Sequence, residues 1–133
     1  MVLASQRVLW PDGTFAPATI HIDAGRITAV EDRISPQAEQ VDLAIVPGYV
    51  DTHCHGAAGA DFTDEDPQKV RAAIEHHRAN GTTTQFASTV TERVDDLVDQ
   101  IHRLRPLVAS GDLAGIHAEG PFLAENRRGA HNP

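Results

Sequence analysis

The chain has 133 residues, of which 41% are hydrophobic and 23% are charged, and its formal net charge is −8 with histidine counted as neutral. This composition predicts a globular chain rather than a disordered one.

The negative charge argues against a general nucleic-acid-binding surface, which needs a basic face. The single cysteine excludes an internal disulfide and favours a reducing compartment. Since neither a signal peptide nor a membrane-spanning apolar run is found, we expect a cytoplasmic protein that binds neither nucleic acid nor a membrane.

Residues 1–46 are predicted to form a small β-domain, or the N-terminal portion of one. The segments ATIHID and RITAVE alternate apolar and polar residues on either side of Ala24-Gly25, which indicates the two arms of a hairpin. Residues 32–40 are polar and predict a loop.

From residue 47 onward, predicted strands and helices alternate. YVDTHCH, TTTQF and LAGIHAEG predict three strands. Asp66-Pro67 predicts a helix start, and a second amphipathic helix follows that is expected to end or kink at Pro106. Because strand–helix–strand units pair in parallel through right-handed crossovers, residues 47–133 are predicted to open an α/β barrel of the TIM type. A closed eight-stranded barrel needs about 250 residues, so the chain is expected to be a truncated N-terminal part of such a barrel.

Two histidines and a glutamate have the clearest chemistry. His53 and His55 lie at positions i and i+2 of a predicted strand, so their side chains share a face. Both imidazoles can then reach one cation, because zinc–nitrogen bonds are about 2.0–2.1 Å long. Glu119 ends the third predicted strand, and the chemistry of α/β barrels lies at such strand ends. The alternatives are two solvated histidines on an exposed strand, and an ion pair between Glu119 and a nearby arginine.

The neighbouring residues have simpler interpretations. Asp51 shares the parity of the two histidines, whereas Cys54 has the opposite parity and is predicted to be a small buried hydrophobic residue. His76 and His77 on the first helix are expected to be surface and interface residues.

The segment PGYVDTHCHG resembles the first barrel strand of the amidohydrolase superfamily, in which Pro-Gly and two hydrophobic residues precede Asp-x-His-x-His. The preceding ATIHIDAGRITAVED is similar to the small β-domain of that superfamily. HAEGPFLAENRRGAHNP is similar to its N-acetylglucosamine-6-phosphate deacetylase branch, where His-x-Glu-Gly-Pro-aromatic-Leu precedes a short basic loop and Gly-x-His. The resemblance covers nearly the whole chain and implies the start of a (β/α)8 amidohydrolase barrel.

This resemblance also implies a site and a reaction. His53, His55 and Glu119 match metal ligands of the family, and Ala130 and His131 match a segment that contacts the sugar. The implied cofactor is a divalent metal, zinc in the first place and iron or another divalent ion otherwise. Either one or two ions are implied, and the presence of both histidines favours two ions bridged by Glu119. The implied reaction is deacetylation of N-acetylglucosamine 6-phosphate to glucosamine 6-phosphate and acetate by a full-length homodimer.

No catalytic residue is assigned, because the resemblance implies that the general acid/base Asp and further His ligands lie beyond residue 133. The fragment alone is therefore expected to be inactive. One alternative is a dihydroorotase-like or deaminase-like amidohydrolase, which shares His-x-His but not the EGPF and GAH segments. The other alternative is a non-catalytic scaffold of the same fold, in which the metal histidines tend to be lost. The Arg127-Arg128 pair is either a solvated loop or an anchor for a phosphate.

Overall fold

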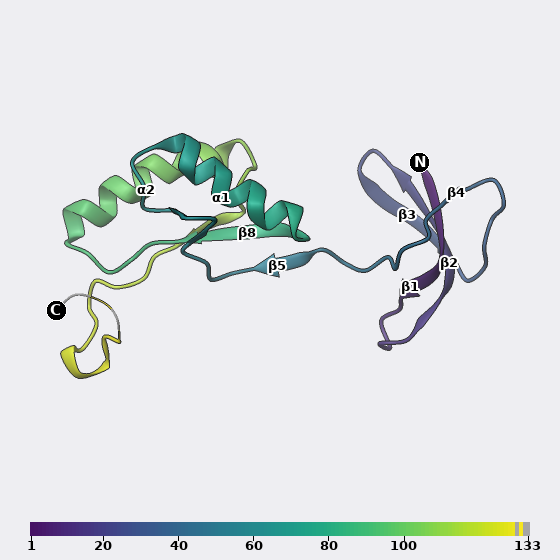
Figure 1. Cartoon of the computed structure of the whole chain (residues 1–133), viewed down its shortest axis with the longest axis horizontal. Coiled ribbons are helices and arrows are strands. Elements are labelled where there is room, and N and C mark those ends of the chain that lie inside the picture. The colour runs from purple at the N-terminus through teal and green to yellow at the C-terminus, as the bar shows by residue number, and fades with distance from the viewer. Residues whose placement is uncertain (130, 132–133) are drawn as a thin grey trace. The chain divides into compact units, whose positions relative to one another are not determined.

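The computed structural model describes residues 1–129 and residue 131. The chain is an α/β structure that divides into two compact units, Met1–Pro47 and Gly48–Pro133 (Figure 1). Within the described residues, neither helix has the length and apolar character that a membrane crossing requires.

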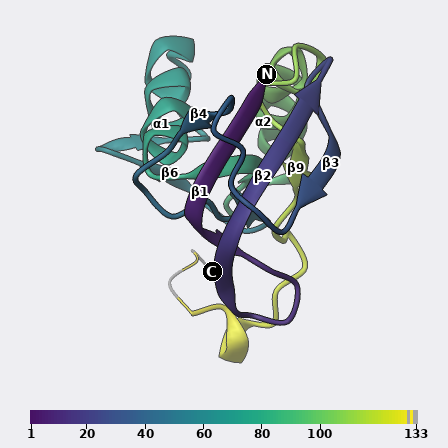
Figure 2. The same cartoon turned by 90° about the vertical axis from the view of Figure 1, so that its right-hand side faces the viewer.

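The first unit is a four-stranded sheet in the order β3-β2-β1-β4 (Figure 2). Its strands are β1 (Val2–Leu9), β2 (Phe15–Asp23), β3 (Arg26–Glu31) and β4 (Glu39–Gln40). β1, β2 and β3 pair in antiparallel fashion, whereas β4 runs parallel to β1. The predicted hairpin is confirmed, because β2 and β3 are joined at Ala24 and Gly25 with positive φ angles of 47° and 74°.

The second unit is built on a parallel sheet in the order β5-β8-β9. Its strands are β5 (Tyr49–Asp51), β8 (Thr82–Ser88) and β9 (Gly115–His117). The predicted parallel pairing of three strands is therefore confirmed. The first strand is shorter than predicted, however, because Cys54 N–H donates to the Ser88 side chain instead of continuing the ladder. His53 and His55 consequently lie in the segment after β5 rather than on it.

Two helices and a small hairpin complete this unit. The hairpin of β6 (Gly56–Ala57) and β7 (Ala60–Asp61) precedes α1 (Pro67–Ala79), and α2 (Val94–Ala109) connects β8 to β9. Asp66 caps α1 by accepting from Gln68 N–H, as predicted. Pro106 lies inside α2 rather than ending it. A short 3-10 helix, η1 (Glu125–Arg127), follows β9.

The core of the second unit lies between the helices and the sheet. Both helices lie on the same side of β5 and β8 (Figure 1). The buried cluster draws on α1, α2 and β8 and consists of Phe62, Val70, Ala73, Ile74, Ala87, Leu104, Leu107 and Leu113. Helix packing therefore fixes the parallel strands, and with them the segments that leave their carboxyl ends.

Candidate metal centre

Three side chains that the sequence predicts as ligands converge beyond the strand ends. His53 and His55 follow β5, and Glu119 follows β9. The Nε2 atoms of His53 and His55 are 3.2 Å apart. Glu119 Oε2 lies 3.4 Å from His53 Nε2 and 3.2 Å from His55 Nε2. These residues meet because β5 and β9 run parallel in one sheet, which places their carboxyl ends at the same edge.

The strand between them holds both ligand segments in place. Cys54 N–H donates to Ser88 Oγ at 3.1 Å, and Ser88 N–H donates back to Cys54 O at 2.8 Å. Glu119 N–H donates to Thr89 Oγ1 at 3.0 Å, and Thr89 N–H donates to His117 O at 3.0 Å. Both Ser88 and Thr89 are fully buried. This pair is not among the residues predicted from the sequence, although two small hydroxyl residues at the end of a buried strand are a signal that could identify it.

His131 reaches the same cluster from the loop after η1. Its Nε2 lies 2.9 Å from Glu119 Oε1, and its Nδ1 accepts from Thr91 N–H at 3.3 Å. A ring nitrogen that accepts carries no proton, so His131 donates from Nε2 to the carboxylate. Arg128 further fixes this segment by donating to His131 O at 2.6 Å. Ala130, the other residue expected to contact the sugar, lies outside the described residues.

The electrostatics keep Glu119 ionised. Burial raises the pKa of this carboxyl, but the hydrogen bond from His131 and the nearby imidazoles of His131, His55 and His53 together outweigh it, so that the pKa is lowered. Glu119 Oε2 and His55 Nδ1 nevertheless lack a hydrogen-bond partner among the described residues, although both atoms are buried. A buried carboxylate oxygen without a hydrogen-bond donor is costly unless a cation binds it.

The spacing of the donor atoms fits a divalent metal. Ligand atoms of a tetrahedral zinc site with bonds of about 2.0–2.1 Å lie roughly 3.3 Å apart. The three separations among His53, His55 and Glu119 are 3.2, 3.4 and 3.2 Å. His117 is a further candidate that the prediction does not include, because His53, His117 and Glu119 each place one ligand atom within 4.8 Å of the others. Its Nδ1 lies 3.1 Å from Ser88 Oγ, which orients the ring.

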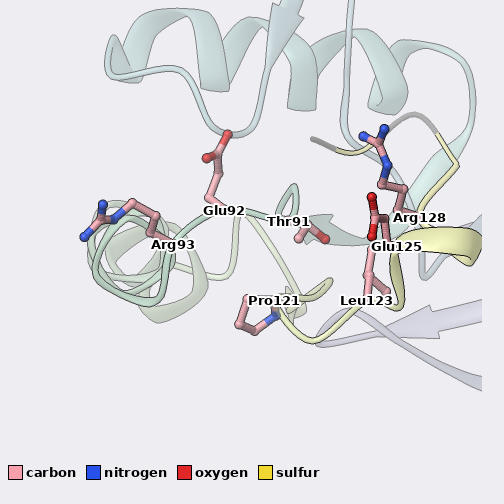
Figure 3. Close-up of a pocket in the computed structure, with 7 residues that line it drawn as sticks. All are labelled: Thr91, Glu92, Arg93, Pro121, Leu123, Glu125 and Arg128. Atoms are coloured by element: carbon pink, nitrogen blue, oxygen red, sulfur yellow. The ribbon is translucent and has the colours of Figure 1, made fainter. Parts of the chain in front are cut away.

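An open pocket of about 490 Å³ adjoins the His131 segment. Figure 3 shows Thr91 and Pro121 on one side of it, and Leu123, Glu125 and Arg128 on the other. Thr91 and Arg128 both line this pocket and hydrogen-bond to His131. A small polar molecule in this pocket would therefore contact the residues that position His131.

Known proteins similar to this chain were found by sequence, although no protein-family model matches it. The chain is 28% identical, over 99% of its length, to an N-acetylgalactosamine-6-phosphate deacetylase of Escherichia coli O157:H7. It is 29% identical, over 84% of its length, to an N-acetylglucosamine-6-phosphate deacetylase of Bacillus subtilis. The chain spans only 36% and 31% of these two relatives.

Solved structures of similar proteins match the whole chain. An N-acetyl-D-glucosamine-6-phosphate deacetylase from Mycobacterium smegmatis superposes with a TM-score of 0.88 and 39% identity, and the match covers 39% of that chain. A variant of the enzyme from this organism, solved in complex with N-acetyl-D-glucosamine-6-phosphate, gives a TM-score of 0.90 and 38% identity over 36% of its chain. Over its whole length the chain therefore resembles part of an N-acetylglucosamine-6-phosphate deacetylase, as its PGYVDTHCHG and HAEGPF motifs predict.

Proposed function

We propose that the chain is part of a metal-dependent deacetylase that hydrolyses N-acetylglucosamine 6-phosphate to glucosamine 6-phosphate and acetate. The main support is the convergence of His53, His55 and Glu119 at separations that suit zinc. The proposed reaction follows the names of the similar proteins, which are deacetylases of N-acetylglucosamine 6-phosphate. In this proposal, residues 47–133 are the first strands and helices of a (β/α)8 barrel, and residues 1–46 are part of a small β-domain. The whole protein is proposed to be a homodimer.

The proposed ion is zinc, with iron as the alternative, because two imidazoles and one carboxylate are ligands that both metals accept. Glu119 bridges the ions if two are bound. A divalent metal held by these residues would supply Lewis-acid catalysis, which polarises the amide carbonyl and ionises water near neutral pH. We assign no general acid for the leaving amine among the residues of this chain.

His131 is proposed to orient the substrate. Its Nε2–H points to Glu119, and its Nδ1 is occupied by Thr91 N–H, so the ring presents one defined donor at the metal cluster. This donor can turn to the acetyl carbonyl oxygen of a bound sugar. Arg128 lines the adjoining pocket and is the proposed phosphate contact, whereas Arg127 of the predicted basic pair is exposed and does not line it.

A second candidate substrate is N-acetylgalactosamine 6-phosphate. The observation that favours it is the similarity to a deacetylase named for this sugar, which covers 99% of the chain. The two sugar phosphates differ only in the orientation of one hydroxyl group, and no described residue is assigned to that group.

The test is acetate release by the full-length metal-loaded protein. We expect turnover of N-acetylglucosamine 6-phosphate, less turnover of its galactose epimer, and least of unphosphorylated N-acetylglucosamine. Dihydroorotate and an aminopurine in the same panel would detect the other amidohydrolase activities. If no acetylated sugar is hydrolysed by protein with bound metal, the proposal is wrong. If both epimers are hydrolysed equally, the deacetylase reaction remains supported, but the assignment of N-acetylglucosamine 6-phosphate as the preferred substrate is wrong.

A further inference from the structure

A second group of ligand atoms surrounds Cys54, the only cysteine among the 133 residues. Cys54 Sγ lies 3.1 Å from His77 Nε2. Asp51, Cys54 and His77 each place one ligand atom within 4.8 Å of the others, and all three are half-buried. Since none of them belongs to the His53–His55–Glu119 cluster, the proposed hydrolysis makes no use of this group.

The carbonyl oxygen of Gly56 adds a further donor. It lies 3.2 Å from His77 Nε2 and 3.4 Å from Cys54 Sγ, so these three atoms form a nearly equilateral triangle. Gly56 has a φ of 148°, and a Cβ at this position would overlap the Ala60 carbonyl of the facing strand. Only glycine permits this close approach of β6 and β7. The hairpin therefore positions the carbonyl independently of any ion.

We propose that Cys54, His77 and Asp51, with the Gly56 carbonyl, form a binding site for a second zinc-type divalent cation. Sulfur, imidazole and carboxylate ligands together suit zinc. Calcium and magnesium are disfavoured because they prefer oxygen ligands throughout. With zinc–sulfur and zinc–nitrogen bonds of about 2.3 and 2.0–2.1 Å, the sulfur and nitrogen would lie roughly 3.6 Å apart. The observed 3.1 Å is the spacing of a thiol–imidazole hydrogen bond, which metal binding would replace with a small rotation of the two side chains.

The position of this site gives the bound ion a structural role. Cys54 separates His53 from His55 in the sequence, and His77 lies in the last turn of α1. A cation held by Cys54 and His77 would tie the histidine-bearing segment to α1 and restrain the two imidazoles. This inference is independent of the deacetylase proposal, because it rests on the geometry of other residues.

Cobalt(II) provides a direct test, since a thiolate–cobalt bond absorbs in the near ultraviolet and imidazole or carboxylate ligation does not. The wild-type protein is expected to show this band on cobalt titration. The band should disappear in Cys54→Ser and fall at least about tenfold in His77→Gln at the same cobalt concentration. It should persist in Glu119→Gln, which alters only the other cluster. His76→Gln is the matched control, because His76 is the exposed neighbour of His77 on α1.

Two outcomes would overturn the proposal. One is the absence of any thiolate band in the wild-type protein at saturating cobalt. The other is a band in His77→Gln as strong as that in His76→Gln, which would mean that Cys54 binds cobalt without its partner. X-ray absorption on the zinc-loaded wild-type protein needs no variant and must show a sulfur neighbour at about 2.3 Å. A spectrum with only nitrogen and oxygen neighbours would equally contradict the site.

Discussion

The hydroxyl groups of Ser88, the last residue of β8, and of Thr89, which follows it, hold the histidine and glutamate segments in register. Ser88 Oγ accepts from Cys54 N–H, and Thr89 Oγ1 accepts from Glu119 N–H. Both hydroxyls are buried, so the loss of either would leave a backbone donor unsatisfied, which costs about 1–3 kcal/mol. Two residues that are not themselves candidate ligands therefore orient the candidate ligands, as supporting residues commonly do in metal sites.

Glu119→Gln is expected to lower both metal content and turnover more than His53→Ala or His55→Ala. The carboxylate approaches both histidines and also accepts from His131, so its neutralisation affects every member of the cluster. Metal analysis and acetate release on the same preparations of full-length protein provide the measurement. Wild-type turnover with a normal metal content in Glu119→Gln would remove this residue from the site.

His131→Ala is expected to lower kcat/KM for the sugar phosphate by roughly tenfold or more, which corresponds to about 1.4 kcal/mol of transition-state binding. The reason is the loss of the single donor that the ring presents at the cluster. Metal content should remain that of the wild type. Arg127→Ala serves as the control, because that side chain is exposed at the end of η1, just before the loop of His131. Equal kcat/KM values in the two variants would contradict the orienting role.

At the scale of elements, α1 connects the two candidate sites to the rest of the second unit. Its first residue follows the Asp66 cap, and its last turn carries His77. Arg71 and Arg78 of the same helix bind Asp112 in the loop that leads to β9. Displacement of α1 would therefore reach both the Cys54 group and the strand that precedes Glu119.

Asp66→Ala is expected to destabilise the protein by about 1 kcal/mol, because the Asp66 carboxylate caps α1 through Gln68 N–H. Thermal or denaturant unfolding measures the change. Glu65→Ala is the matched control, since Glu65 is the adjacent exposed carboxylate and does not cap the helix. Equal stability of the two variants would show that the cap contributes nothing.

Asp112 makes stability depend on pH. Hydrogen bonds from Ser110 and Arg71 hold the pKa of Asp112 below its ordinary value of 3.8, with burial acting in the opposite direction. A carboxyl whose pKa is lower in the folded state stabilises the fold above its unfolded pKa, and this contribution disappears as the pH falls through the folded value. Asp112→Asn should therefore lower Tm at pH 7, and the difference from wild type should shrink below pH 3.8.

The control for this pH dependence is Asp99→Asn, because Asp99 is an exposed carboxylate of α2. Its Tm difference from wild type should be small at both pH values. A Tm difference in Asp112→Asn that is the same at pH 7 and at pH 3 would exclude a contribution from ionisation.

At the scale of the whole molecule, the second unit has apolar side chains that its described residues leave exposed. β5 and β9 form the two edges of the sheet. Tyr49 and Val50 on β5 are 65% and 64% exposed, and Phe122 after β9 is 92% exposed. The chain spans 39% and 36% of the two similar chains from Mycobacterium smegmatis.

Residues 1–133 expressed alone are expected to self-associate and to show no deacetylase activity. Open sheet edges and exposed apolar side chains favour association between copies. Size-exclusion chromatography and acetate release with added zinc provide the measurements, with the full-length protein as the control. A monomer that unfolds cooperatively would contradict the first expectation, and measurable turnover the second.

The sequence alone determined the parallel arrangement and the position of the three candidate ligands. Alternation of strands and helices permits one sheet type, and the His-x-His and HAEGPF motifs place His53, His55 and Glu119 at strand ends. The role of these three residues as metal ligands stays a prediction, but their proximity is observed. This much was predictable because the periodicity of each strand and helix is a local property, and because short crossovers between successive strands favour parallel pairing.

Only the tertiary structure decided which distant residues meet. Cys54 contacts His77, 23 positions away, instead of behaving only as a small hydrophobic residue. Asp51 places a ligand atom near those of Cys54 and His77, and it also accepts from His53 N–H at 3.1 Å. Thr91 likewise reaches His131 across 40 positions. Such contacts depend on how helices pack against a sheet, and the periodicity of the sequence does not predict that packing.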